Sequence, residues 1–154
     1  MTEQDQKYIQ EQVSEVPILQ TLSPEELEQI LAYTELKTYS ENTTLFEEGD
    51  RGDYICFVLE GTIDIRKASV SGHQTIMAKF GRGSIVGEMA AVDLYPRSAT
   101  ARVTSNSKLL ILSRDNFEKI SQDFPQLSIK ILREIARILS LRLRRSSGRF
   151  SDFF

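Results

Sequence analysis

The sequence predicts an α+β protein that is mainly β: an eight-stranded antiparallel β-roll, or jelly roll, flanked by N-terminal helices and a long C-terminal helix. Short apolar runs broken by Gly, Asn and Asp follow one another from about Leu36 to Ser113. A helix-start signal precedes this stretch, and a long run with helical spacing of its apolar residues follows it. Short strands at regular spacing between turn residues are typical of an antiparallel roll or sandwich.

Two helical segments are expected before the strands. The first 20 residues have weak helical character that ends before Pro17. The stretch Ser23-Pro24-Glu25-Glu26 begins a second helix, because it places a serine cap, a proline at the first helical position and a carboxylate three residues after the cap. The apolar face of this second helix consists of Leu27, Ile30 and Leu31.

The strands are predicted from the alternation of their side chains. In Tyr54–Leu59 both alternating sets are largely apolar, so we expect this strand to be buried on both faces. In Thr62–Arg66 apolar and polar residues alternate, which indicates a half-buried strand, and Glu60-Gly61 forms the tight turn between the two. Further strands fit Thr44–Phe46, Thr75–Phe80, Ala99–Val103 and Lys108–Leu112.

The pattern becomes helical again after Ser113. A short helix over Arg114–Gln122 is broken at Phe124-Pro125, and a long helix of about five turns then covers Leu127–Arg145 until Gly148 ends it. Its apolar stripe consists of Ile131, Leu132, Ile135, Ile138, Leu139 and Leu143. We therefore divide the chain into an N-terminal helical segment (1–22), a β-roll with flanking helices (23–125), the long helix (126–145) and a tail (146–154).

Composition excludes several classes of protein. At 154 residues, with 40% hydrophobic and 27% charged residues, the chain is predicted to be one globular domain. It has no run of 18 apolar residues and its polar N-terminus lacks a secretory signal, so a cytoplasmic location is expected. The lone Cys56 excludes a disulfide framework, and a single histidine excludes a cupin-type metal enzyme. We expect neither catalysis nor a metal or cofactor.

Charge is distributed unevenly along the chain. Residues 1–50 hold twelve acidic residues and two lysines, a net charge of −10, whereas residues 101–154 hold eleven basic and five acidic residues, a net charge of +6. A solvated helix face accounts for the basic end most simply. An acidic partner is the alternative. A membrane role is disfavoured, because the roll must use much of the apolar face of the long helix.

Residues 86–100, VGEMAAVDLYPRSAT, carry the candidate binding site. Residues 87–91 can form one helical turn whose backbone N–H groups converge on an anion, and Gly87 permits tight backbone geometry. The planar fork of Arg97 suits a phosphate, while Glu88 suits a ribose hydroxyl. These groups together match a ribose fused to a phosphate, although Glu88 and Arg97 could instead form a surface ion pair with each other.

Three ordered blocks make the chain resemble the cyclic nucleotide-binding domain family. Residues 86–100 are similar to the family's phosphate-binding cassette, Phe-Gly-Glu-Leu-Ala-Leu followed by a short turn and Pro-Arg-Ala/Ser-Ala-Thr/Ser. Leu45–Gly61 resembles the β-roll core of the family, and Gly81-Arg82-Gly83 leads into the cassette. The resemblance covers roughly residues 23–145. Two apolar replacements, Val86 for Phe and Ala91 for a larger aliphatic residue, remove no polar contact.

The resemblance implies a role for each residue of the cassette. Glu88 would hold the ribose 2′-hydroxyl and Arg97 the cyclic phosphate. The remaining ligand-binding residues would be Gly87, Met89, Ala90, Ser98 and Ala99. Cyclic GMP-selective members often have a threonine where this chain has Ser98, so cyclic AMP is favoured over cyclic GMP. The long helix would cap the base, with Ile131, Arg133, Ile135 and Ile138 as candidate contacts.

The resemblance also implies a sensor or regulatory module. Ligand would pull the short helix inward and pivot the long helix about Phe124-Pro125, which would signal to a protein partner or to a second copy in a homodimer. A helix-turn-helix domain follows this module in bacterial transcription factors. Only about nine residues follow Arg145 here, so sequence-specific DNA binding is not expected. The alternative is a degenerate β-roll that binds no nucleotide and acts as a protein-interaction scaffold.

Overall fold

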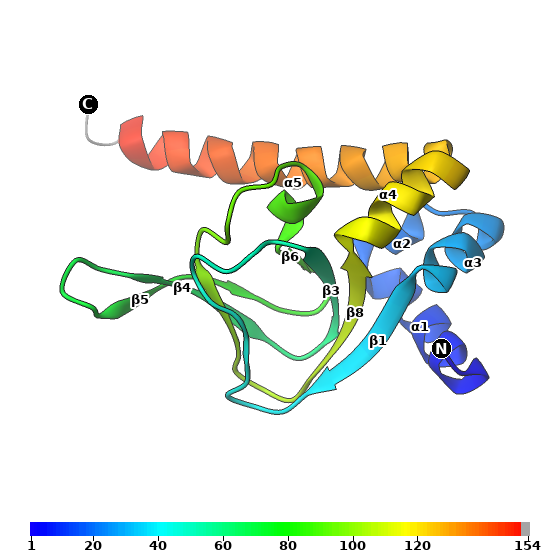
Figure 1. The fold of residues 1–154 in the computed structure, drawn as a ribbon, viewed down its shortest axis with the longest axis horizontal. Coiled ribbons are helices and arrows are strands. Elements are labelled where there is room, and N and C mark those ends of the chain that lie inside the picture. The colour runs from blue at the N-terminus through cyan, green and yellow to red at the C-terminus, as the bar shows by residue number, and fades with distance from the viewer. Residues whose placement is uncertain (152–154) are drawn as a thin grey trace.

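Eight strands form two antiparallel four-stranded sheets in the computed structural model, which describes the backbone of residues 1–151 and the side chains of residues 1–148. One sheet has the order β1-β8-β3-β6 and the other the order β2-β7-β4-β5 (Figure 1). The expected eight-stranded roll is confirmed. The strands are β1 (Thr34–Tyr39), β2 (Thr44–Phe46), β3 (Tyr54–Glu60), β4 (Ile63–Ala68), β5 (Gln74–Phe80), β6 (Ile85–Val86), β7 (Thr100–Val103) and β8 (Ser107–Ser113).

Helices cover one face of the first sheet, and the long helix α5 runs across the whole width of the roll (Figure 1). The α-helices are α1 (Glu3–Gln12), α2 (Pro17–Gln20), α3 (Pro24–Ala32), α4 (Arg114–Asp123) and α5 (Pro125–Ser151). Two short 3₁₀ turns are η1 (Val13–Glu15) and η2 (Glu88–Ala91). The expected capping box of α3 is present, because Ser23 and Glu26 each accept a hydrogen bond from the other's backbone N–H.

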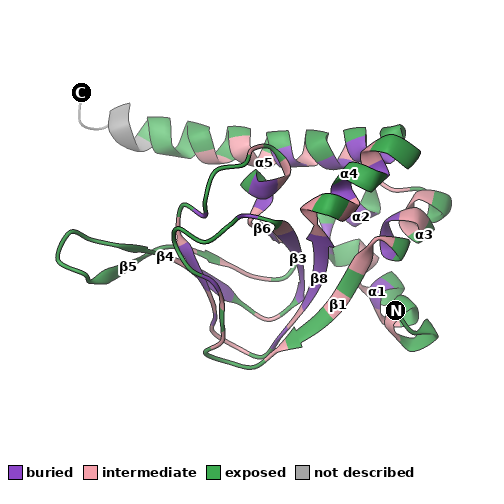
Figure 2. Ribbon diagram, viewed as in Figure 1, coloured by how far each residue is buried: buried purple, intermediate pink, exposed green. Residues whose placement is uncertain are grey.

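Strand β3 separates two hydrophobic cores. Its side chains Ile55, Phe57 and Leu59 point into the core between the first sheet and the helices, whereas Cys56 and Val58 point into the core between the two sheets. Figure 2 shows burial concentrated on β3 and β8, the two central strands of this sheet. The predicted two-faced burial of this strand is therefore observed.

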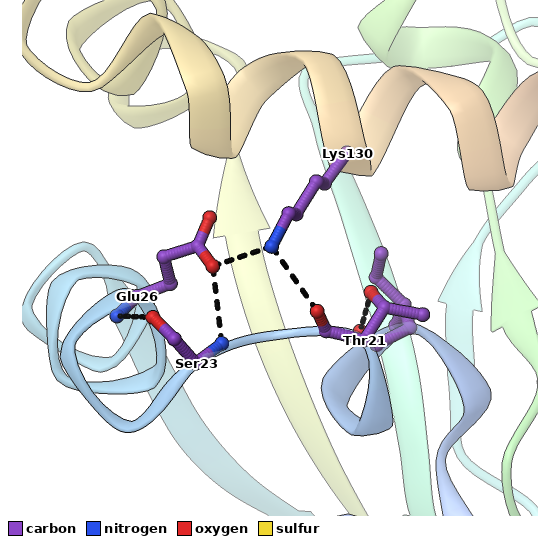
Figure 3. A network of polar contacts seen from close by, with 5 residues as sticks. Thr21, Ser23, Glu26 and Lys130 are labelled. Atoms are coloured by element: carbon purple, nitrogen blue, oxygen red, sulfur yellow. Dashed lines mark hydrogen bonds and ion pairs between the residues drawn. The ribbon is translucent and has the colours of Figure 1, made fainter.

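The first half of α5 is anchored to the N-terminal helices. Leu127, Ile131 and Ile135 are fully buried in the helical core. Lys130 donates to a Glu26 carboxylate oxygen at 2.5 Å and to the backbone carbonyl of Thr21 at 3.2 Å (Figure 3). The Lys130 bond and the capping bonds hold the pKa of the Glu26 carboxyl below its usual value. The start of α5 is thereby fixed by both packing and charge.

Helix α5 extends further than the sequence indicated. It begins at Pro125 and continues through Gly148 to Ser151, so the prediction that Gly148 ends it is wrong. Gly148 does not adopt the left-handed conformation that ends helices, and a glycine inside a helix costs only about 1 kcal/mol relative to alanine. Residues 146–151 of the expected tail are thus helical, and residues 152–154 lie outside the described residues.

The packing of α5 predicts that two of its apolar residues contribute very differently to the free energy of unfolding. Ile131→Ala should lower the free energy of unfolding by about 2–5 kcal/mol, because it leaves a cavity in the helical core. The matched change Leu143→Ala, at a side chain that is 68% exposed, should alter it by less than about 0.5 kcal/mol. Urea unfolding of both variants measures the difference, and similar losses would contradict the packing described for α5.

Candidate functional site

A cavity of about 470 Å³ lies between the β-roll, the η2 turn and α5. Its volume falls within the range typical of small-molecule sites. Both sheets contribute to its walls, and three charged residues of the segment 86–100 line it: Glu88, Asp93 and Arg97. The lining residues are Phe46, Gly52, Ile65, Ala78, Phe80, Val86, Gly87, Glu88, Met89, Ala90, Asp93, Tyr95, Pro96, Arg97, Ser98, Ala99, Leu139 and Arg142.

The guanidinium group of Arg97 is held in a bracket of backbone and aromatic groups. Its Nη1 donates to the carbonyl of Gly87 at 3.2 Å, and its Nη2 donates to the carbonyl of Tyr54 at 2.6 Å. Its central carbon lies 3.9 Å from the centre of the Phe46 ring and 4.8 Å from that of Tyr54. These contacts fix the orientation of the guanidinium before any ligand arrives.

The backbone of Arg97 is fixed by the turn between β2 and β3. Its N–H donates to the carbonyl of Asp50 at 2.7 Å, and its carbonyl accepts from Gly49 at 2.8 Å. The turn itself is closed by the Asp50 carboxylate, which accepts from the N–H of Glu47 at 2.9 Å. The block Leu45–Gly61, one of the three blocks that carry the family resemblance, therefore fixes the position of the Arg97 backbone.

Arg97 is a buried cation without a carboxylate partner among the described side chains. The residue is only 7% exposed, and no acidic group of the described part lies within ion-pair distance of it. Its buried Nε–H also has no hydrogen-bond acceptor there. A buried charge left in this state is unfavourable, so the site favours an anion in the cavity.

Glu88 supplies a negative charge to the cavity wall. It is 5% exposed, and its carboxylate accepts a hydrogen bond from Nη1 of Arg142 on α5. Glu88 and Arg97 therefore do not pair with each other, which was the simple alternative to a binding site. Arg97 therefore has no carboxylate partner among the described side chains, whereas Glu88 is paired with Arg142 of α5.

Gly87 has a conformation that only glycine adopts readily. Its φ of +75° is left-handed, and a Cβ placed there would lie 2.5 Å from Nη1 of Arg97. The η2 turn that follows contains only four residues, Glu88–Ala91, so it lacks the dipole of a full helix. The expected attraction of an anion by a helix N-terminus is therefore minor here, and Arg97 provides the main positive charge.

All seven ligand-binding residues expected from the sequence line the cavity, whereas the four expected base contacts do not. Ile131 and Ile135 are buried in the helical core, Arg133 is exposed, and Ile138 packs at the edge of that core. The residues of α5 that reach the cavity are Leu139 and Arg142. The sequence showed the apolar stripe of the helix but not which edge of the stripe faces the roll.

Arg114 is a further site residue that the sequence did not reveal. It is the first residue of α4, and its Nη1 donates to the carbonyls of Ala90 and Asp93, both at 2.6 Å. The cassette is thereby tied directly to the helix that precedes α5. Because the acceptors are backbone carbonyls, no partner side chain in the sequence could have indicated this contact.

Cys56 lies in the core beneath the cavity wall and plays no visible chemical role. Complete burial raises the pKa of its thiol to about 12, so the reactive thiolate is suppressed near neutral pH. Cys56 is therefore a packing residue of the core between the two sheets.

Comparison with known proteins assigns this geometry to a family. Residues 36–124, more than half of the chain, match the family described as cyclic nucleotide-binding domain. The chain belongs to this family. The family is regulatory rather than catalytic, and the matched segment contains the cassette, the arginine bracket and most of the β-roll.

Other members of the cyclic nucleotide-binding domain family are similar over most of the chain. The cyclic AMP receptor protein of Thermus thermophilus is 28% identical over 83% of this chain and 57% of its own length. A cAMP-dependent protein kinase regulatory subunit of Aspergillus niger is 32% identical over 70% of this chain and 26% of its own. A cyclic nucleotide-binding domain from Methylobacillus flagellatus superposes with a TM-score of 0.83, at 28% identity, over 98% of this chain and 85% of that one.

The chain spans less than two thirds of the receptor protein and of the kinase subunit. The absence of sequence-specific DNA binding therefore stays a prediction, as does the cytoplasmic location. Among the described residues, no helix combines the length and apolarity that crossing a bilayer requires.

The close approach of Gly87 to Arg97 makes this position sensitive to a single methyl group. Gly87→Ala should lower the free energy of unfolding by about 1–3 kcal/mol, because it strains the backbone and displaces the guanidinium. The matched change Gly81→Ala adds a Cβ into open space and should change it by less than about 0.5 kcal/mol. Chemical denaturation measures the free energy of unfolding of both variants, and equal effects would contradict the close packing of Gly87 against the Arg97 guanidinium.

Proposed function

We propose that this domain binds cyclic AMP, in preference to cyclic GMP, and reports its presence to a protein partner. The observation that carries the proposal is the buried guanidinium of Arg97, which lines the cavity without a carboxylate partner among the described side chains. A singly charged cyclic phosphate would neutralise it through a charge-assisted hydrogen bond. Ser98 and Ala99, which follow Arg97 in the sequence, also line the cavity.

The remaining walls suit the other two parts of a cyclic nucleotide. The Glu88 carboxylate accepts hydrogen bonds only, as a ribose hydroxyl that donates requires. Ile65, Phe80 and Leu139 form an apolar wall against which a purine can stack or pack. Two relatives carry cyclic AMP in their names, and Ser98 stands where cyclic GMP-selective members often have threonine. These features together support cyclic AMP as the ligand.

We further propose that α4 and α5 transmit occupancy. Arg114 ties the cassette carbonyls of Ala90 and Asp93 to the start of α4, and α4 packs directly on α5. A ligand that draws the cassette toward the cavity would therefore move α4 and pivot α5 about Phe124-Pro125. The two arrangements of α5 would form the two states whose populations the ligand shifts.

A second copy of this chain is the partner that α5 fits best. Ile129, Leu132, Ala136 and Leu143 are exposed and recur at spacings of three, four and seven residues. Such a stripe is the seam through which two helices pair in a coiled coil. The stripe lies beside the face that packs on the roll, so a dimer would be sensitive to the position of α5.

Thermal unfolding with nucleotides tests the ligand. Cyclic AMP at about 100 times its dissociation constant should add roughly 2.7 kcal/mol to the free energy of unfolding, with smaller effects from cyclic GMP and non-cyclic AMP at the same concentration. Arg97→Ala should abolish the shift, while Arg133→Ala, at an exposed arginine outside the cavity, should keep it. If Arg97→Ala does not fold, Arg97→Lys keeps the charge without the fork and should weaken the shift.

Two results would contradict the proposed ligand. A larger shift with cyclic GMP would reverse the assignment of the base. No shift with any cyclic nucleotide would mean that the roll binds none of them and would favour a protein-interaction scaffold.

Sedimentation velocity tests the α5 dimer. The double variant Leu132→Glu with Leu143→Glu should be monomeric at concentrations where the wild type is dimeric, because it places charges in the seam. Arg137→Gln, an exposed change at a position of the same helix that faces away from the seam, should leave the dimer intact. A wild type that stays monomeric with and without cyclic AMP would exclude a second copy as the partner.

A further inference from the structure

A second cavity, of about 310 Å³, lies between α2, the turn from β5 to β6 and one face of α5. It has the volume of about ten water molecules, at roughly 30 Å³ each, so its size suits a small molecule. Phe80 and Arg142 line both this second cavity and the cavity beside Arg97, so they lie between the two.

Much of the wall of the second cavity is apolar. Ile18 of α2 and Ile85 of β6 are almost completely buried in it, and Ile138 of α5 is half-buried. Leu141 also lines the second cavity, yet it is 44% exposed. An apolar group bound in the second cavity would remove this leucine from water, which is favourable.

The face of α5 that lines the second cavity is opposite to the stripe proposed as a dimer seam. Its members recur at spacings of four, three and four residues and are Glu134, Ile138, Leu141 and Arg145. With 3.6 residues per turn, this face is turned by about half a circle from the seam. A second copy paired through the seam therefore leaves the second cavity uncovered.

Positive charge is in excess around the second cavity. Its charged lining residues are one carboxylate, Glu134, and four cations: Lys79, Arg137, Arg142 and Arg145. Arg137 donates to Glu134, and Arg142 donates to Glu88, so these two cations are paired. Among the described side chains, no carboxylate lies within ion-pair distance of Lys79 or Arg145. Two uncompensated positive charges, one on β5 and one on α5, therefore border the second cavity.

We propose that the second cavity binds a small organic anion, a carboxylate carried on an apolar body. The apolar body covers Leu141 and the wall around it, and the carboxylate lies between Lys79 and Arg145. The planar guanidinium of Arg145 matches a carboxylate through two parallel hydrogen bonds, while Lys79 adds a point charge. This site is additional to the cavity beside Arg97 and does not depend on the ligand proposed there.

Titration with octanoate, followed through the backbone amide signals in NMR spectra, tests the site. Octanoate should shift the amide signals of Gly83 and Leu141, which line the second cavity, and leave those of Gly87 and Ala99 in place. Two matched probes separate the contributions, because 1-octanol has the same chain without the charge and inorganic phosphate has charge without a chain. Each should bind at least about tenfold more weakly than octanoate.

Charge reversal at the two unpaired cations tests their role. The double variant Lys79→Glu with Arg145→Glu should weaken the binding of octanoate by about tenfold or more, because it replaces both partners of the carboxylate. The double variant Arg133→Glu with Arg144→Glu changes the net charge equally at two exposed arginines outside the second cavity, and it should bind octanoate like the wild type. All four side chains are exposed, so both variants should fold.

Several results would overturn the proposal. One is the absence of octanoate binding, and another is a shift of Gly87 and Ala99 in place of Gly83 and Leu141. Equal losses in the two double variants would show a non-specific effect of charge, and equal binding of 1-octanol or phosphate would show that only one half of the site contributes. Signals of residues 134–145 that shift with protein concentration alone would show that a second copy covers this face.

Discussion

The buried guanidinium of Arg97 is the interaction on which the site depends. It is a full positive charge with no carboxylate among the described side chains, so the fold must hold it with dipoles and rings instead. The carbonyls of Gly87 and Tyr54 and the ring of Phe46 do this from three different segments of the chain. The left-handed glycine follows from the same constraint, because any Cβ at position 87 would enter the space of the guanidinium.

The charges of Arg97 and Glu88 are stabilised in different ways. Backbone carbonyls of Gly87 and Tyr54 fix Arg97, whereas Glu88 is neutralised by the Arg142 side chain of α5. The first of these contacts lies within the roll and the cassette, and the second joins the cassette to α5.

The sequence predicted the parts of the site that are local, and missed the parts that depend on packing. Gly87, Glu88 and Arg97 lie within one short stretch, and the order of a glycine, two charges and small residues along it indicates a binding turn without any knowledge of the tertiary structure. Leu139 and Arg142 reach the cavity because of the orientation of α5 about its own axis. Contacts between residues far apart in the chain determine this orientation. Strands β1 and β6 were also not located individually, and β6 contains only two residues, too few to show a period.

The N-terminal helices belong to the same core as α5. Ile9, Ile18 and Leu19 are buried together with Ile131 and Ile135, although they lie outside the segment 36–124 that defines the family. A protein shortened to that segment would lose one wall of its helical core and expose the outer face of β3 and β8. The helical core therefore extends beyond the region shared with the family, and it joins the N-terminal helices to the first half of α5.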